Sequence, residues 1–312
     1  MSQTHHAEVS EAAAGPTTKD GYLGANRSPA ARVLRGFRQF IVRKPLGALG
    51  LLIIVLLVGV AVFADILERS DPNALDTGRL LQPPSAQAWF GTDQLGRDLY
   101  SRVIAGSRVA VTVGFVSVAI ATVIGTAIGL VSGYYGGKVD LIVQRFVDAI
   151  IAFPALVLAL AVVTAIGPSI RNLIIAIAVV STPGFSRVVR ASVLGVTNNA
   201  YIEAARSLGQ TTPKILLLHV FPNVTAPIIV VATGSVGGAI LAEAGLSFLG
   251  LGPPPPNATW GSMLAADARF YITTAWWLAV VPSVAISLAV LGCNLFGDAL
   301  RDALDPRLRG VR

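Results

Sequence analysis

The feature that most limits the fold of this chain is a series of long apolar runs. The first, Leu46 to Ala64, carries no charged side chain, and at 1.5 Å per residue it makes about 28 Å of helix, close to the thickness of a bilayer's hydrocarbon core. Its basic leader is too long for an ordinary signal peptide, so we interpret it as a retained span. Five further runs follow: Val109 to Val131, Phe146 to Ala165, Leu173 to Val189, Val224 to Leu246 and Trp277 to Phe296.

The composition indicates the same class of protein. Hydrophobic residues make up 54% of the chain and charged residues only 13%, with a mean hydropathy of +0.68, more than a soluble domain of this size needs for its core. We therefore predict an all-α integral membrane protein with six transmembrane helices. Its single cysteine, Cys293, cannot form a disulfide within the chain.

The charge pattern predicts the orientation. The net charge is +7, but the basic residues cluster beside the apolar runs, so we attribute them to membrane orientation and predict no nucleic-acid partner. An even number of spans leaves both termini on one side, and the positive-inside rule makes that side the cytoplasm.

The chain divides into segments of different character. We predict a disordered cytoplasmic tail at 1–31, a basic interfacial helix on anionic membrane lipid at 32–45, the first span at 46–64, an extracytoplasmic segment at 65–107, a five-span core at 108–297 that contains a cytoplasmic loop at 195–223, and a cytoplasmic C-terminal tail at 298–312.

Within the extracytoplasmic segment, the residues from Gly91 to Asp98 are predicted to begin a helix. Leu95, Leu99 and Val103 recur every fourth residue, which places them on one helix face. Asp93 with Arg97, and Asp98 with Arg102, have the spacing of helical ion pairs.

Glycine and proline positions predict how the spans pack and bend. Gly125 and Gly129 in the second span have the four-residue spacing that allows close helix approach, whereas we attribute Gly133 and Gly137 to a turn-like run. Four prolines interrupt spans and predict kinks: Pro154, Pro183, Pro227 and Pro282.

The polar loop at 195–223 is predicted to hold two short helices. Asn198 or Asn199 can cap the first, and Gly209 stands where a helix-ending residue with positive φ is wanted. Thr212 and Pro213 can begin the second helix, which stops at Pro222. Ala204 and Ala205 beside Glu203 form a small, smooth face suited to close docking. The plain alternative is a polar loop that only joins two spans.

The same loop resembles the cytoplasmic loop of binding-protein-dependent ABC importer permeases. The matching residues are Glu203, Ala204, Ala205, Gly209, Phe221 and Pro222. His219 stands where the general pattern has a branched aliphatic residue, but His-x-x-Pro-Asn is similar to the dipeptide, oligopeptide and nickel branch. The run from Gly91 to Arg102 and the phrase around Glu243 resemble that branch too.

The resemblance implies a type I ABC importer permease fold in a bacterial plasma membrane and a role for the loop in coupling to an ATPase. It implies four partners: a second homologous permease, two ABC ATPase subunits that bind ATP and Mg²⁺, and an extracytoplasmic substrate-binding protein. The solute stays open among dipeptides, longer peptides, nickel chelates, glutathione and haem.

Glu243 is the most deeply placed acid, well inside the fifth span. An intramembrane carboxylate is by default a candidate for the translocation path or its gate. A buried structural hydrogen bond and a position at the outer rim are the alternatives.

The chain lacks the motifs of catalysis. The nearest approach to a phosphate-binding loop, Gly136-Gly137-Lys138, has Ser132 and Val139 at positions that need Gly and Ser or Thr. No metal-binding or nucleophile motif is present, so we predict no catalytic residue, metal or cofactor in this chain. A secondary transporter driven by an ion gradient is the runner-up, although it would need paired intramembrane charges and inverted repeats. A non-transporting scaffold comes third.

Overall fold

The computed structural model describes residues 44–265 and 269–304. The predicted tail at 1–31, nearly all of the predicted interfacial helix at 32–45 and the end of the predicted C-terminal tail lie outside the described residues. The described part is helical, and its elements are α2 (Pro45–Val62), α3 (Ala64–Leu67), α4 (Leu99–Tyr135), α5 (Gly137–Ile151), α6 (Ala155–Ile166), α7 (Ile170–Thr197), α8 (Ala200–Ser207), α9 (Thr212–Ile215), a π-helical turn η1 (Leu216–Val220), α10 (Phe221–Phe248), α11 (Trp260–Met263), α12 (Arg269–Tyr271) and α13 (Trp277–Leu304).

Five of the described helices are long and apolar enough to cross a membrane: α2, α4, α7, the continuous helix 212–248 and α13. The pair α5 and α6 makes a sixth span if the two count as one, but they meet at an angle of 88°. The predicted span Phe146 to Ala165 is therefore sharply bent, and the kink predicted at Pro154 is confirmed. Pro154 has no N–H and disfavours helical geometry in the residue before it, so the helix ends there.

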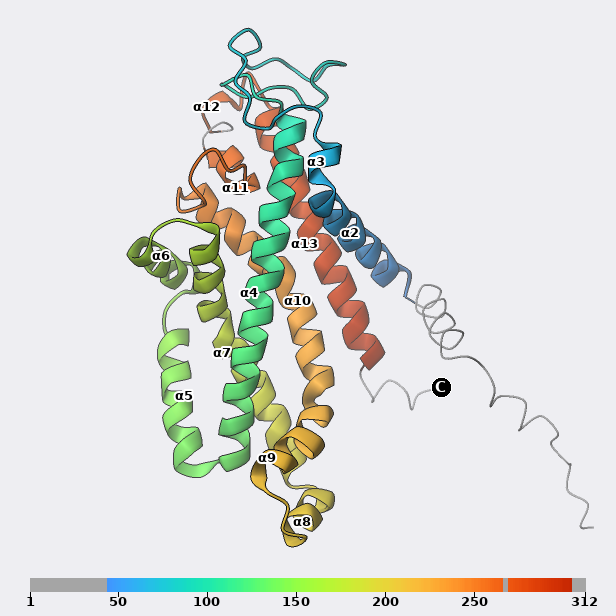
Figure 1. Cartoon of the computed structure of the whole chain (residues 1–312), viewed down its shortest axis with the longest axis vertical. Coiled ribbons are helices and arrows are strands. Elements are labelled where there is room, and N and C mark those ends of the chain that lie inside the picture. The colour runs from blue at the N-terminus through green and yellow to red at the C-terminus, as the bar shows by residue number, and fades with distance from the viewer. Residues whose placement is uncertain (1–43, 266–268, 305–312) are drawn as a thin grey trace, which may run out of the picture. The chain divides into compact units, whose positions relative to one another are not determined.

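The helices α4, α7, α10 and α13 pack side by side, as Figure 1 shows. Small residues let α4 and α7 meet closely. A Cβ on Gly125 would lie 2.5 Å from the Phe185 Cβ, and one on Gly129 would lie 2.7 Å from the Ser186 carbonyl oxygen. The predicted glycine contact is confirmed, and it extends to Gly133, which we had assigned to a turn.

The segment between α3 and α4 closes the end of the bundle opposite α8 (Figure 1). The predicted helix from Gly91 is wrong, because α4 begins only at Leu99. Asp98 is its N-cap and accepts a 2.9 Å hydrogen bond from the Ser101 N–H. Asp93 is fully buried in the preceding turn, where Arg97 Nε donates to it at 2.6 Å and Arg102 Nε lies 3.7 Å away. Local side-chain bonds here replace the first turns of a helix.

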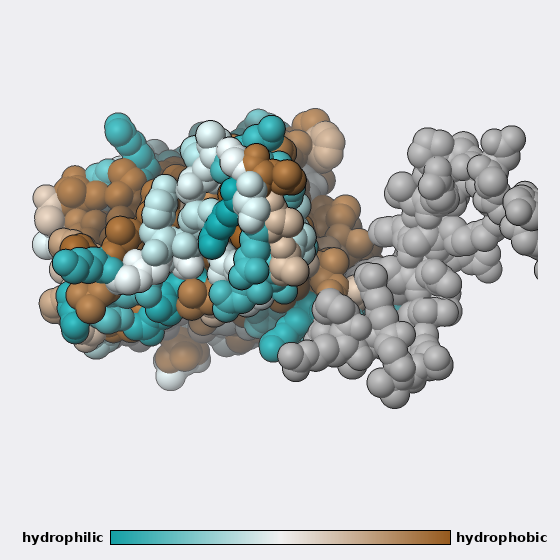
Figure 2. Space-filling model, turned by 90° about the horizontal axis from the view of Figure 1, so that it is seen from below, coloured by the Kyte–Doolittle hydropathy of each residue, from teal (hydrophilic) through white to brown (hydrophobic). Residues whose placement is uncertain are grey.

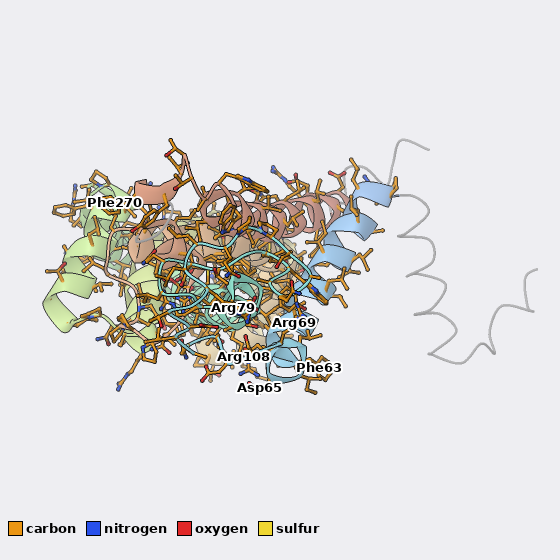
Figure 3. All side chains as sticks on the ribbon, turned by 90° about the horizontal axis from the view of Figure 1, so that it is seen from above. Phe63, Asp65, Arg69, Arg79, Arg108 and Phe270 are labelled. Atoms are coloured by element: carbon orange, nitrogen blue, oxygen red, sulfur yellow. The ribbon has the colours of Figure 1, made fainter. Side chains whose placement is uncertain are left out.

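An ion pair ties the end of α2 and α3 to α4. Arg108 donates to both Asp65 carboxylate oxygens at 2.6 and 2.7 Å and to the Ala61 carbonyl at 2.9 Å. Figure 3 shows Asp65 and Arg108 next to each other beside α3. These hydrogen bonds hold the pKa of the Asp65 carboxyl below its ordinary value. The helix α2 also contacts α13, where a Cβ on Gly50 would lie 2.7 Å from the Gly292 carbonyl oxygen.

Candidate functional site

The helix α8 presents one face to the protein and the other to its surroundings. Ile202 is 0% exposed and Ala205 only 5%, and both pack in an apolar cluster with Val189, Val193, Ile215, Val220, Val224 and Ile228. Glu203 and Ala204 are exposed. The predicted alanine face is therefore corrected in part. Ala205 packs α8 against the bundle, and of the two alanines only Ala204 is exposed to a partner.

The turn after α8 has the predicted geometry. Gly209 has a φ of 75°, a region that glycine enters without steric cost. The Gly209 N–H donates to the Arg206 carbonyl at 2.9 Å, and the Gln210 N–H donates to the Ala205 carbonyl at 3.1 Å. These bonds satisfy carbonyls at the end of α8 and reverse the chain direction. Asn199, one of the two predicted caps, occupies the N-cap position, but its side chain makes no capping hydrogen bond there.

The second helix differs from the prediction at both ends. Its N-cap is Thr211 rather than Thr212. It does not stop at Pro222 but continues through η1 directly into α10, so that residues 212–248 form one helix. At the end of the π-helical turn η1, the Phe221 N–H donates to the Leu216 carbonyl. A π-helical turn adjusts the backbone locally, which allows a proline to follow without a break.

Two side-chain contacts hold the loop in shape. The His219 Nε2 and Gln210 Oε1 share a hydrogen bond of 2.9 Å, which joins the π-turn to the reversal after α8. The Arg206 guanidinium lies 5.0 Å from the centre of the Tyr134 ring, a cation–π contact with the end of α4. Sequence reasoning missed Gln210 and Tyr134, because no spacing rule relates residues that meet only through the fold.

Ion pairs connect α5 to α7 beside this loop. Arg190 donates through Nε to Asp140 Oδ1 at 2.6 Å, and the Ser132 hydroxyl donates to the same oxygen. Arg187 pairs with Asp148 at 2.7 Å. These two ion pairs hold α5 against α7.

The outward surface of the loop combines an acid with apolar side chains. Leu208, at the tip, is 81% exposed, and Leu217 and Leu218 on η1 are exposed as well. Figure 2 looks onto this end of the molecule, where teal and pale residues gather at the centre and brown hydrophobic residues lie towards the edges. We call Tyr201, Glu203, Ala204 and Leu208 the loop surface.

A large cavity of about 890 Å³ lies between α6, α7 and α10. Its wall is apolar apart from the hydroxyls of Ser181 and Ser235. Several wall residues, including Leu156, Leu241 and Phe248, are also exposed, so the cavity opens on the surface of the chain. Its lining is Ala155, Leu156, Ala159, Ile177, Val180, Ser181, Gly184, Phe185, Val231, Ser235, Gly238, Ala239, Leu241, Ala242, Ala244, Gly245, Phe248, Leu264 and Ile286.

Glu243 lies on α10 but does not line this cavity. It is 1% exposed, and its Oε1 accepts a 2.7 Å hydrogen bond from the Ser247 hydroxyl. Its Oε2 has no hydrogen-bond partner among the described residues. The backbone next to Glu243 is tightly packed, since a Cβ on Gly261 would lie 2.1 Å from the carbonyl oxygen of Ala244. In the described part of the chain, no three His, Cys, Asp or Glu side chains gather as metal ligands would.

Comparison with known proteins places the fold and the loop in a family. Residues 125–310 match the family described as the inner membrane component of binding-protein-dependent transport systems. The chain is 43% identical over 273 residues to the dipeptide transport system permease protein of Alkalihalophilus pseudofirmus, covering 88% of this chain and 89% of that protein. It is 45% identical over 272 residues to the di/tripeptide transport system permease protein of Pseudomonas aeruginosa, with 85% and 89% covered.

A third relative is the glutathione transport system permease protein of Escherichia coli, 43% identical over 285 residues, with 91% of this chain and 92% of that protein covered. Among solved structures, the MetNI methionine ABC transporter in an inward-facing conformation shares the fold with a TM-score of 0.54 at 18% identity. The match covers 65% of this chain and 96% of that chain.

Proposed function

The chain belongs to the family of inner membrane components of binding-protein-dependent transport systems, and from this premise we propose that it imports di- or oligopeptides, or a related small solute, as the permease subunit of an ATP-driven transporter. A second, homologous permease, two ABC ATPase subunits and an extracytoplasmic binding protein complete the assembly. ATP and Mg²⁺ bind to the ATPase subunits.

The chemistry shared by the relatives supports a short peptide as the solute. Their names specify dipeptides, di- and tripeptides, and glutathione, which is itself a tripeptide. Each carries a charged carboxylate and at least one peptide bond. A solute of this kind fits a transporter whose selectivity lies in a separate binding protein.

The observation that carries the coupling role is the continuity of the loop with α10. The loop surface is exposed at the tip, and the helix that follows it runs without a break to Phe248. An ATPase that pushes on this surface therefore acts on the wall of the cavity through one helix. Glu203 and Ala204 touch the ATPase, Ala205 and Gly209 set the direction of α8, and His219 and Pro222 belong to the junction with α10.

The cavity forms half of the solute path, and the second permease closes its open side. Glu243 is a buried structural residue in this arrangement, because its side chain lies outside the cavity wall and bonds to Ser247. This assignment replaces the role in the path or gate that we expected for it.

Copurification of the ATPase with a tagged permease tests the coupling role. Leu208 and Ile66 are equally exposed, at 81% and 78%, but lie at opposite ends of the bundle. Leu208→Asp should lose most of the bound ATPase, because an apolar contact becomes a desolvated charge, whereas the control Ile66→Asp should keep it. If Leu208→Asp retains full ATPase and full uptake, the loop is not the coupling element.

A further inference from the structure

The helix α5 carries four charged side chains, and only its acids have partners. Both acids form ion pairs with arginines of α7: Asp140 with Arg190 and Asp148 with Arg187. The two basic residues, Lys138 and Arg145, are exposed. Neither of them forms an ion pair within the part of the chain that the structure describes. The charge that α5 presents to its surroundings is therefore positive.

The same outward face of α5 is strongly apolar. Lys138 and Arg145 are seven residues apart, which is two helical turns, so they lie on one face of the helix. Leu141 and Ile142 occupy the turn between them, and Phe146 lies beside Arg145. All three apolar side chains are exposed, Phe146 at 71%. Two free cations and three large apolar side chains thus share one exposed surface, which we call the α5 face.

The α5 face lies at the cytoplasmic boundary of the membrane. Figure 1 shows α5 at the side of the bundle, towards the end that carries α8. Tyr135, the last residue of α4, is exposed just before α5 begins, and exposed tyrosines are enriched where a membrane meets water. Lys138 follows at this level. Arg145 lies about 10 Å further along the helix, but helical side chains tilt towards the N-terminus of their helix, which brings the guanidinium back towards the level of Lys138.

Neither water nor the hydrocarbon core suits the α5 face. A contiguous apolar patch is unfavourable in water, and unpaired cations are costly among lipid tails. The boundary of a leaflet that contains anionic lipid satisfies both kinds of side chain, because phosphates attract the cations while the acyl chains cover the apolar groups.

We propose that the α5 face binds an anionic phospholipid of the cytoplasmic leaflet. Lys138 and Arg145 contact its phosphate, and the apolar side chains between and beside them lie along its acyl chains. This site is separate from the lipid contact predicted for the segment 32–45. It goes beyond the proposed function and does not depend on which solute the transporter carries.

The test uses a tryptophan reporter, Phe146→Trp, in the full-length permease with every subunit that copurifies. The protein is reconstituted in vesicles of equal parts phosphatidylcholine and phosphatidylglycerol, with bromine on the acyl chains of one lipid or the other. Quenching of the reporter by each brominated lipid gives their relative binding constant at the α5 face. The protein with Phe146 in place gives the background from the four native tryptophans: Trp89, Trp260, Trp276 and Trp277.

We expect brominated phosphatidylglycerol to quench the reporter more strongly than brominated phosphatidylcholine. Lys138→Gln and Arg145→Gln should each lower the relative binding constant for phosphatidylglycerol by about fivefold, and salt at about 0.5 M should weaken the preference because it screens exposed charges. Arg171→Gln is the matched control. It removes an exposed cation at the start of α7, the end of that helix away from α8, and should leave the constant unchanged.

Three results would overturn the inference. Equal quenching by the two lipids would show that the α5 face has no preference for anionic lipid. An unchanged preference in the Lys138→Gln and Arg145→Gln variants would show that other residues attract the lipid. Absence of quenching by either lipid would show that protein covers the α5 face, with the second permease as the occupant.

Discussion

Gly209 offers the sharpest test of how the loop holds its shape. Its φ is 75°, and a Cβ placed there would meet nothing within 4 Å. A substitution therefore adds backbone strain without a steric clash with a neighbour. For an alanine, the left-handed region costs about 1–2 kcal/mol, which changes the ratio of native to altered turn by a factor of about 5–30. A β-branched valine costs more.

The variant Gly209→Asn distinguishes the effect of backbone strain from the effect of adding a side chain. It adds a larger group than alanine but visits the left-handed region more readily. We expect retained ATPase to fall in the order Gly209, Gly209→Asn, Gly209→Ala and Gly209→Val. Gly195→Ala is the control, because Gly195 has the same open surroundings and no positive φ.

The measurement is the amount of ATPase copurified per tagged permease, together with peptide uptake. The transmembrane helices are not touched, so membrane insertion and pairing with the second permease should stay at the wild-type level. Equal ATPase retention by the alanine and asparagine variants would show that positive φ does not control the docking geometry. Full retention by the valine variant would refute the structural role of the turn altogether.

Three other predictions concern orientation, helix pairing and the buried acid. A cysteine at position 79 in place of Arg79 should react with an impermeant reagent on intact cells, and one in place of Arg206 should not; the reverse pattern would invert the topology. Arg190→Ala and Asp140→Ala should each lower the melting temperature of the detergent-solubilised permease. In a double-mutant cycle the two substitutions should show a coupling energy of about 0.5–3 kcal/mol. A coupling energy near zero would show that this ion pair does not stabilise the packing of α5 against α7. Glu243→Gln should keep uptake and stimulated ATPase activity near wild type, because an amide oxygen can still accept from Ser247, and a large loss of uptake would return Glu243 to the path.

The spans could be predicted from the sequence because the cost of exposing polar groups to lipid forces long apolar helices. The same signal could not show that α5 and α6 meet at 88°. A hydropathy sum is the same for a straight helix and for two halves joined at Phe153 and Pro154. Proline predicted a kink there, but the angle depends on how α6 packs against α7.

Features of the loop that depend on one residue and its chain neighbours could be predicted from the sequence. Features that depend on packing against other helices could not. Gly209 follows from the need for positive φ at a helix end, which is a property of one residue. Ala205 was assigned to the wrong side, because Ala204 and Ala205 have the same composition and differ only in which one points at Val189 and Val193. The pair Asp140 and Arg190 is separated by 50 residues in the chain, and no spacing rule reaches that far.

The incorrect prediction that the second helix of the loop stops at Pro222 has the largest consequence for mechanism. A stop there would have left the loop joined to the fifth span by a flexible turn, which could absorb a push from the ATPase. The structure instead joins them through η1 into one helix from Thr212 to Phe248. Hydrogen bonds along a helix resist bending except at identifiable weak points, here the π-helical turn and Pro227, which lies inside α10. Because Gly238 and Gly245 lie beyond both points on the same helix, movement of the loop must either bend α10 at one of them or move the cavity wall itself.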